Sequence, residues 1–222
     1  MTISVENFIK TIYHQSIHQN ANTKLSSIAK SLQITSAAAT DMAKKLSARN
    51  LVHYTKYKPL TLTSNGNKLA LNIVRKHRLW ECFLHQTLNL SLHEIHQEAE
   101  NLEHATSDYL ADKIEAFLGN PGFDPHGDPI PSNSGNIEND KQQILLSEAP
   151  AGKKYQISRL FSSELDFFHF CDENELSIGA NIEVDKQYAS SKMTEIRVNG
   201  NKILLNKQFT NVIFVRLNRT ES

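Results

Sequence analysis

Apolar residues in the first fifty positions recur every three or four residues, which is the spacing of a helix that buries one face. This pattern predicts helices over residues 5–18, 23–32 and 35–50, separated by a polar run and by a tight turn. Thr35 or Ser36 is expected to cap the third helix, because a hydroxyl there can accept a backbone N–H. The expected inward positions are Val5, Phe8, Ile9, Ile12, Tyr13, Leu25, Ile28, Ala29, Leu32, Ala39, Met42 and Leu46.

Two short apolar runs, 51–54 and 60–63, predict a β-hairpin with a basic tip at 56–59. Helix, short helix, turn, helix and basic hairpin is the order of a winged helix-turn-helix; a plain three-helix domain with a hairpin is the alternative. Small side chains at the start of the third helix allow it to approach base edges in a major groove. The predicted DNA contacts are Ser36, Ala37, Ala38 and Thr40 for bases, and Lys44, Lys45, Arg49, Lys56 and Lys58 for phosphates.

The middle of the chain predicts two long helices. The first, over 65–88, has a wide apolar face and can be capped by Thr63 or Ser64. The second is expected to run from a capping box at Ser91 and Glu94 to about residue 118. Broad apolar faces beside a DNA-binding unit favour a dimer interface, because symmetric DNA sites need a symmetric protein.

The last hundred residues change character. Gly, Pro, Asn and Ser are frequent over 119–150, which predicts a linker. Short strands separated by glycines then predict a small SH3-like β-barrel, interrupted by a helix near 163–171. The expected strands are 154–159, 182–184, 195–198, 203–205 and 212–217.

The zero net charge conceals a strong asymmetry along the chain. Residues 1–65 hold eight Lys/Arg against two Asp/Glu, residues 66–145 hold six against twelve, and residues 146–222 hold ten of each. A basic first third suits a polyanionic partner, because neutralising phosphates releases counterions. No apolar run approaches the roughly 18 residues of a membrane span, and the N-terminus lacks a signal-peptide pattern. We therefore expect a cytoplasmic protein with no membrane partner.

Histidine and carboxylate side chains form stripes on the two middle helices. His77 and Glu81 are four residues apart, and His96, Glu100, Glu103 and His104 lie on one helix face. Ionised carboxylates on such a stripe repel one another, and a divalent cation removes that repulsion. A solvated or hydrogen-bonded side chain is the ordinary role of any one of these residues, but six together favour a metal. With only two cysteines in the chain, nitrogen and oxygen ligands suit Mn²⁺ or Fe²⁺ better than structural zinc.

These stretches resemble the DtxR/MntR family of metal-dependent bacterial repressors, in particular its manganese-responsive branch with a C-terminal FeoA-like, SH3-type domain. The resemblance is carried by residues 62–66, 75–79, 96–104 and 124–131 and extends over nearly the whole chain. The fold class is therefore expected to be mainly α with a small β domain. The expected parts are a winged helix-turn-helix DNA-binding domain (1–64), a helical metal-binding and dimerisation domain (65–131), a linker (132–149) and a FeoA-like β-barrel (150–222).

The resemblance implies a primary metal site built from Asn7, Glu100, Glu103 and His104. Iron-responsive members carry Cys at the position of Glu100, so the carboxylate favours Mn²⁺. Fe²⁺ is the alternative metal, and Zn²⁺ is a metal that could bind in vitro. Two features depart from the pattern. Asn7 stands where many manganese-responsive members have Asp, and Lys10 stands where two-metal members have Glu. An ammonium group there cannot ligate a metal, so we expect a mononuclear primary site.

The resemblance also implies a second metal site that links the long helices to the linker and barrel. Its candidate ligands are His77, Glu81, His96, Asp124, His126 and Glu164. His77 also matches a position that supports a neighbouring metal in the two-metal members.

The function expected from these features is a metal-activated repressor of metal-uptake genes, which binds double-stranded operator DNA as a homodimer. A winged-helix regulator that senses a small organic ligand and an iron-responsive family member are the alternatives. A di-metal enzyme is disfavoured because the paired Glu-x-x-His pattern is missing, and no nucleophile–base pair or Gly-rich phosphate loop indicates catalysis. Another alternative is a barrel that acts as a docking module, with the helices merely structural. We expect no enzyme activity and no small organic substrate.

Overall fold

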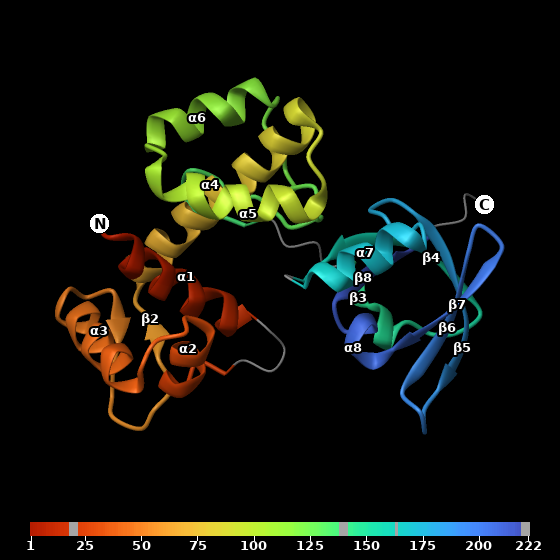
Figure 1. Ribbon diagram of the computed structural model, residues 1–222, viewed down its shortest axis with the longest axis horizontal. Coiled ribbons are helices and arrows are strands. Elements are labelled where there is room, and N and C mark those ends of the chain that lie inside the picture. Colours follow the sequence, from red (N-terminus) through yellow and green to blue (C-terminus); the bar gives the residue numbers. More distant parts are fainter. Residues whose placement is uncertain (18–21, 138–141, 163, 219–222) are drawn as a thin grey trace. The chain divides into compact units, whose positions relative to one another are not determined.

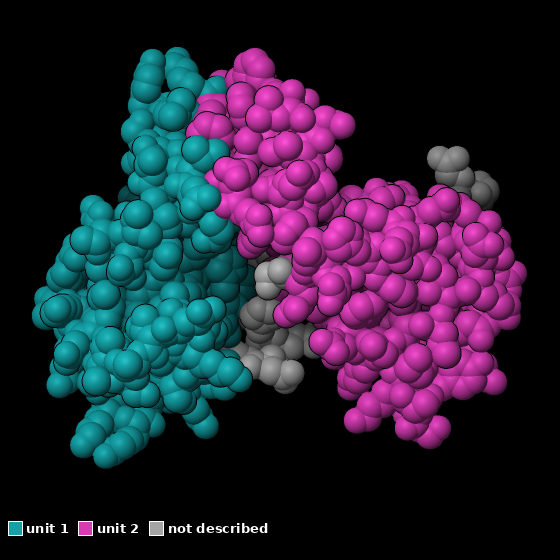
Figure 2. Space-filling view, in the orientation of Figure 1, with its two compact units in different colours: residues 1–77, 100–113, 131–137 teal, residues 78–99, 114–130, 138–222 magenta. Residues whose placement is uncertain are grey.

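The computed structural model describes residues 1–17, 22–137, 142–162 and 164–218 (Figure 1). These residues belong to two compact units, coloured separately in Figure 2. The first unit contains residues 1–77, 100–113 and 131–137, and the second contains residues 78–99, 114–130 and 138–222. The division between units runs through the middle helices, and the predicted domain boundaries at residues 64, 131 and 149 stay predictions.

The first unit begins with three helices and a hairpin. They are α1 (Ile3–Ile17), α2 (Leu25–Ser31), α3 (Ser36–Ala48), β1 (Val52–His53) and β2 (Thr61–Leu62). The two strands pair antiparallel, with Val52 opposite Leu62. Phe8, Ile9 and Ile12 of α1 are fully buried in one core with the apolar faces of α2 and α3. The predicted helix, short helix, turn, helix and hairpin are therefore all present, with boundaries that differ by a few residues.

Hydroxyl caps fix where two of these helices begin. The Thr35 hydroxyl accepts the backbone N–H of Ala38 at the start of α3. At the start of α4 (Ser64–Leu88), the Thr63 hydroxyl accepts the N–H of Gly66. A Cβ on Gly66 would lie 1.9 Å from the carbonyl oxygen of Leu51, so only glycine fits where α4 passes the hairpin.

The second long helix predicted over 91–118 is wrong as a single helix. The chain forms α5 (Leu92–Ala105) and α6 (Asp108–Phe117) instead. The reason is that the Ser107 hydroxyl accepts the backbone N–H of Leu110 in place of a helix carbonyl, and so caps the start of a new helix. The capping box at the start of α5 is confirmed, because Glu94 accepts the Ser91 N–H and the Ser91 hydroxyl accepts the Glu94 N–H.

The second unit contains a six-stranded antiparallel sheet with the order β3-β8-β4-β5-β6-β7. Helix α7 (Leu165–Glu173) buries Phe167, Phe168 and Cys171 in the core of this sheet. The remaining elements are the strands β3 (Ile144–Leu145), β4 (Lys153–Leu160), β5 (Asn181–Tyr188), β6 (Met193–Val198), β7 (Asn201–Asn206) and β8 (Ile213–Leu217), the 3₁₀ turn η1 (Leu146–Glu148) and the short helix α8 (Lys207–Thr210).

The segment 119–150, predicted as a linker, includes ordered structure that composition did not reveal. Phe123 and Pro129 pair across a tight turn, and the N–H of Ile130 bonds to the Gly122 carbonyl. Further along, strand β3 pairs with β8. The turn is polar yet buried, because Asp124 supplies internal hydrogen bonds to it. No helix in the described residues is long and apolar enough to cross a membrane.

Candidate metal centres and DNA-binding surface

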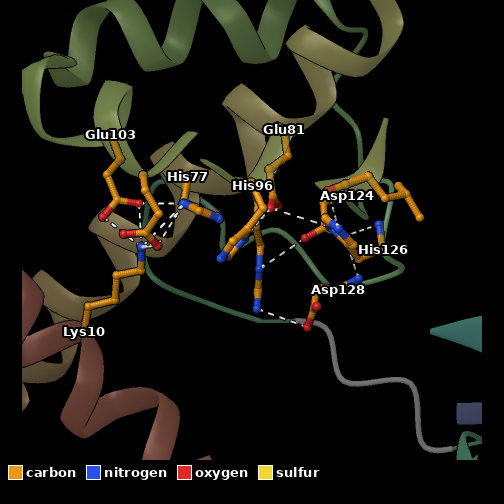
Figure 3. Close-up of polar contacts among 11 residues, drawn as sticks. Lys10, His77, Glu81, His96, Glu103, Asp124, His126 and Asp128 are labelled. Carbon is orange, nitrogen blue, oxygen red and sulfur yellow. Dashed lines mark hydrogen bonds and ion pairs between the residues drawn. The ribbon is translucent and has the colours of Figure 1, made fainter. Parts of the chain in front are cut away.

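A buried cluster in the first unit surrounds the side chain of Lys10 (Figure 3). Its Nζ lies 2.5 Å from Glu100 Oε1 and 2.8 and 2.6 Å from Glu103 Oε1 and Oε2. His77 Nδ1 is 2.6 Å from Glu103 Oε2. An ionised carboxylate only accepts hydrogen bonds, so His77 donates through Nδ1. Glu103, which is 2% exposed, thus contacts both the Lys10 ammonium group and the His77 imidazole.

Helices α1 and α5 position this cluster by simple periodicity. Lys10 faces the core side of α1, as the apolar residues around it do, and is only 7% exposed. On α5, Glu100 and Glu103 are three residues apart, so both point to one side of the helix. His104 follows directly and turns its ring toward α1, where Nδ1 lies 2.6 Å from Glu6 Oε2.

Two buried ligand atoms beside this cluster make no hydrogen bond to any described residue. They are Oδ1 of Asn7 and Nε2 of His104. Because Glu6 accepts from Nδ1 of His104, Nε2 is the ring atom left for a metal, and it lies 3.4 Å from Glu103 Oε1. A carboxylate that holds a histidine in this way is the usual support of a metal-ligating imidazole. These unsatisfied oxygen and nitrogen atoms, next to a buried carboxylate, fit a single divalent cation.

Sequence reasoning missed two features of this cluster. Glu6 was not considered, although it lies one residue before Asn7 and orients His104. Lys10 was expected only to exclude a second metal, yet its side chain contacts both glutamates. The signal for Lys10 was available, since a lysine within the apolar stripe of α1 is buried only if charged partners meet it.

A second buried cluster lies in the second unit, where Glu81, Asp124 and His126 offer ligand atoms within 4.8 Å of one another (Figure 3). Glu81 Oε1 is 3.6 Å from His126 Nδ1 and 3.2 Å from His96 Nδ1. On its other side, His126 Nε2 is 3.2 Å from the Leu92 carbonyl oxygen. Both ring nitrogens of His126 therefore face acceptors.

The electrostatics of this cluster follow from its burial. Burial lowers the pKa of His126, but the hydrogen bond and charge of Glu81, with the charge of Asp124, outweigh it and raise the pKa to about 9. Burial raises the pKa of Asp124 well above its usual range, and the charges of Asp128 and Glu81 add to that rise. Three acidic groups thus crowd one buried place, and a cation there would relieve their repulsion.

Arginines hold the turn that carries Asp124 and His126. Arg78 contacts Asp124 at 3.5 Å and Asp128 at 3.2 Å, and Arg159 of β4 pairs with Asp128. The Leu160 N–H bonds to the His126 carbonyl at 2.9 Å. Helix α4, the turn and the sheet are therefore connected through the residues that flank the cluster.

The remaining predicted ligands are placed as follows. Glu164 is exposed at the start of α7 and belongs to none of the ligand groups formed by the described residues. His77 bonds to Glu103, in the first unit. Cys82 lies near the second cluster, but burial, with Asp124 and Glu81, raises the pKa of its thiol far above neutrality. No ligand group formed by the described residues includes a cysteine, so the candidate donors of both clusters are oxygen and nitrogen atoms.

The predicted DNA contacts are on the surface of the first unit. Ser36, Ala37 and Ala38 are exposed at the N-terminus of α3, and Thr40 is partly exposed with its hydroxyl bonded to the Ser36 carbonyl. Lys44, Lys45, Arg49, Lys56 and Lys58 are also exposed. The hairpin tip adds Tyr57, which is 92% exposed and lies under the Lys56 ammonium.

Three family models match consecutive parts of the chain. The iron dependent repressor, N-terminal DNA binding domain, matches residues 1–60, and the iron dependent repressor, metal binding and dimerisation domain, matches residues 63–132. The FeoA domain matches residues 144–217.

Known proteins are similar to this chain over most of its length. The crystal structure of ScaR with bound Zn²⁺ is 31% identical and covers 96% of this chain and 99% of its own, with a TM-score of 0.84. A manganese-dependent transcriptional repressor in complex with manganese is 27% identical over 96% of this chain and 100% of its own, with a TM-score of 0.89. The iron-dependent repressor IdeR of Mycobacterium tuberculosis is 30% identical over 159 residues, 67% of each chain. The predicted fold class is thereby confirmed, and this chain belongs to the DtxR/MntR family of metal-dependent transcriptional repressors, which are DNA-binding proteins and not enzymes.

Proposed function

We propose that this protein is a manganese-responsive repressor of metal-uptake genes that binds operator DNA as a homodimer. The observation that carries the proposal is the pair of unsatisfied buried atoms, Asn7 Oδ1 and His104 Nε2, beside the buried Glu103. A buried polar atom without a partner is costly, so its retention at this place favours a bound cation as its partner.

The donor atoms favour Mn²⁺ over softer metals. Asn7, Glu100 and Glu103 supply oxygens and His104 supplies a nitrogen, while the thiols of Cys82 and Cys171 are buried and protonated, since burial raises the pKa of each. Hard oxygen ligands suit Mn²⁺, whereas thiolates favour zinc or iron–sulfur chemistry. Glu81, Asp124 and His126 are proposed as a second site of the same character.

The proposed regulation follows from where the ligands lie. Asn7 belongs to α1, which packs in the core of the DNA-binding helices, and Glu103 and His104 belong to α5. Asn7, Glu103 and His104 would hold Mn²⁺, whose positive charge would link these two helices. Glu6 orients His104 for it, and the exposed residues of α3 and of the hairpin tip contact the DNA. If the metal restrains α1 before DNA binds, the DNA-binding helices lose less conformational entropy on binding, and DNA binding becomes tighter.

The two-fold symmetry of a homodimer would match a pseudo-palindromic operator. Helix α6, within the match to a metal binding and dimerisation domain, leaves three large apolar side chains exposed. They are Tyr109, Leu110 and Phe117. We propose that this helix contributes to the dimer interface.

The function is tested by DNA binding at fixed salt with Mn²⁺, Fe²⁺, Zn²⁺ or a chelator. Random duplexes long enough for two half-sites one helical turn apart are first selected with the Mn²⁺-loaded protein. We expect tight binding with Mn²⁺ that disappears with chelator. If the protein bound DNA more tightly with Fe²⁺ than with Mn²⁺ at the same free metal concentration, it would be one of the iron-responsive members. Equal binding with and without metal would contradict metal regulation and favour a small organic effector.

The DNA surface is tested separately through the salt dependence of binding. Replacing Lys44 by Ala should weaken binding to every sequence and reduce the slope of log K against log salt by about 1, because one phosphate contact is lost. Fluorescence anisotropy titrations between low and moderate salt give the slope. Lys153→Ala, an exposed lysine at the start of β4, is the control. An unchanged slope for Lys44→Ala would place the phosphate contacts elsewhere.

A further inference from the structure

Lys10 occupies the centre of a donor set that could itself hold a cation. His77, Glu100 and Glu103 offer ligand atoms that all lie within 4.8 Å of one another. The Lys10 ammonium lies among them, 2.5 to 2.8 Å from three carboxylate oxygens and 3.4 Å from His77 Nδ1. Figure 3 shows its side chain extending from α1 toward Glu103 and His77.

The contacts of this ammonium group are complete. Its three N–H donors match the three carboxylate oxygens, one from Glu100 and two from Glu103. His77 does not accept from Lys10, because its Nδ1 hydrogen already points to Glu103. Lys10 and Glu103 are almost fully buried, and a buried charge is tolerated only with partners of this quality.

The same contacts make the ammonium and a metal ion mutually exclusive among these three residues. A divalent ion placed where Nζ lies, among His77, Glu100 and Glu103, would meet the ammonium group in a buried place where like charges repel strongly. Each carboxylate oxygen has two lone pairs, so Glu100 and Glu103 can still ligate an ion on the side of Asn7 and His104. The atoms left without a partner, Asn7 Oδ1 and His104 Nε2, belong to other residues, so one metal position remains free of Lys10.

The geometry points to Lys10 as a tethered cation that replaces a metal ion in the His77–Glu100–Glu103 group. The ammonium group connects α1 to α5 without any metal. It also limits this region to one regulatory metal ion per chain, bound near Asn7 and His104. The inference rests on the proposed metal regulation. Unlike a bound ion, the lysine cannot dissociate when free metal is scarce, so part of the link between α1 and α5 is permanent.

The test is the number of Mn²⁺ ions bound per chain, measured by equilibrium dialysis and elemental analysis. Lys10→Glu removes the ammonium and adds a carboxylate, and we expect it to bind about one Mn²⁺ more than the natural chain. Lys10→Gln removes the charge alone and should gain a weaker site. Lys10→Arg keeps the charge and should gain none. Lys68→Glu, an exposed position on α4, controls for the general effect of added negative charge.

A second readout does not depend on counting ions. In chelator, Lys10→Gln and Lys10→Glu should melt at lower temperature than the natural chain. Adding Mn²⁺ should raise the melting temperature of these two variants more than it raises that of Lys68→Glu. Circular dichroism verifies that each variant is folded. An unchanged ion count in both Lys10→Glu and Lys10→Gln would overturn the inference. If the natural chain nevertheless binds Mn²⁺, the proposed function survives; if no variant binds it, both fail.

Discussion

Replacing Glu103 by Ala is expected to abolish Mn²⁺-dependent DNA binding and to lower the free energy of unfolding by about 3 kcal/mol. Glu103 is the shared partner of Lys10 and His77, and its side chain is fully buried. Without it, Lys10 keeps only the partly exposed Glu100 as a charged partner, and the remaining buried charge is poorly compensated. The proposed metal ligand is lost by the same change.

Both effects can be separated by experiment. Chemical denaturation in chelator gives the loss of stability, and anisotropy with DNA at saturating Mn²⁺ gives the loss of regulation. Glu98→Ala removes an exposed carboxylate from the same helix and should change neither quantity appreciably. If Glu103→Ala retained Mn²⁺-dependent DNA binding, the assignment of the primary site would be wrong.

Replacing Gly127 by Ala is expected to disrupt the buried turn that carries Asp124 and His126, at a cost of at least about 3 kcal/mol. Gly127 has a φ of +82°, and an added Cβ would lie 2.1 Å from the Ser158 carbonyl oxygen and 3.0 Å from the Arg159 Cα. Both are backbone atoms of β4, which cannot rotate away as a side chain can. The turn would have to separate from the strand.

Two other glycines isolate the cause of this effect. Gly152 has a φ of +77° but open space around it, so Gly152→Ala should cost only about 1 kcal/mol for the unfavourable conformation. Gly122 has neither constraint, and Gly122→Ala should change stability by less than about 0.5 kcal/mol. Hydrogen exchange at the Leu160 amide, which bonds to the His126 carbonyl, should accelerate only in Gly127→Ala. Equal stability of Gly127→Ala and Gly122→Ala would contradict the close packing of the turn on β4.

The consequence of Gly127→Ala for the second metal cluster follows from the same contacts. The turn brings His126 and Asp124 to Glu81, and Arg78 and Arg159 hold it through Asp128. If the turn moves, the three candidate ligands no longer meet, so the proposed Mn²⁺ binding at this cluster should be lost with the packing. The glycine therefore serves the proposed site without contacting it.

Local periodicity determined most of what the sequence revealed. The winged helix-turn-helix order, the long helix α4, the Ser91–Glu94 capping box and the β-rich last third all follow from spacings and caps that act over a few residues. The donor types of the metal clusters follow as well, because His and Glu at helical spacing must share a face. The break between α5 and α6 was missed, since the Ser107 cap competes with an apolar pattern that continues past it.

Only the tertiary structure decided which charged groups meet. Lys10 and Glu103 are separated by 93 positions in the sequence, and no local rule states that an ammonium group would contact both Glu100 and Glu103. Likewise, the buried turn at 123–130 was predicted as part of a linker because Gly, Pro, Asn and Ser are frequent over 119–150. Its hydrogen bonds come from Asp124 and from β4, which composition does not reveal. Periodicity determines which face of a helix is buried, whereas the pairing of buried charges depends on long-range packing. The sequence thus determined the family and the chemistry of the candidate ligands, and the contacts between side chains of α1 and α5 decided the partners of Lys10.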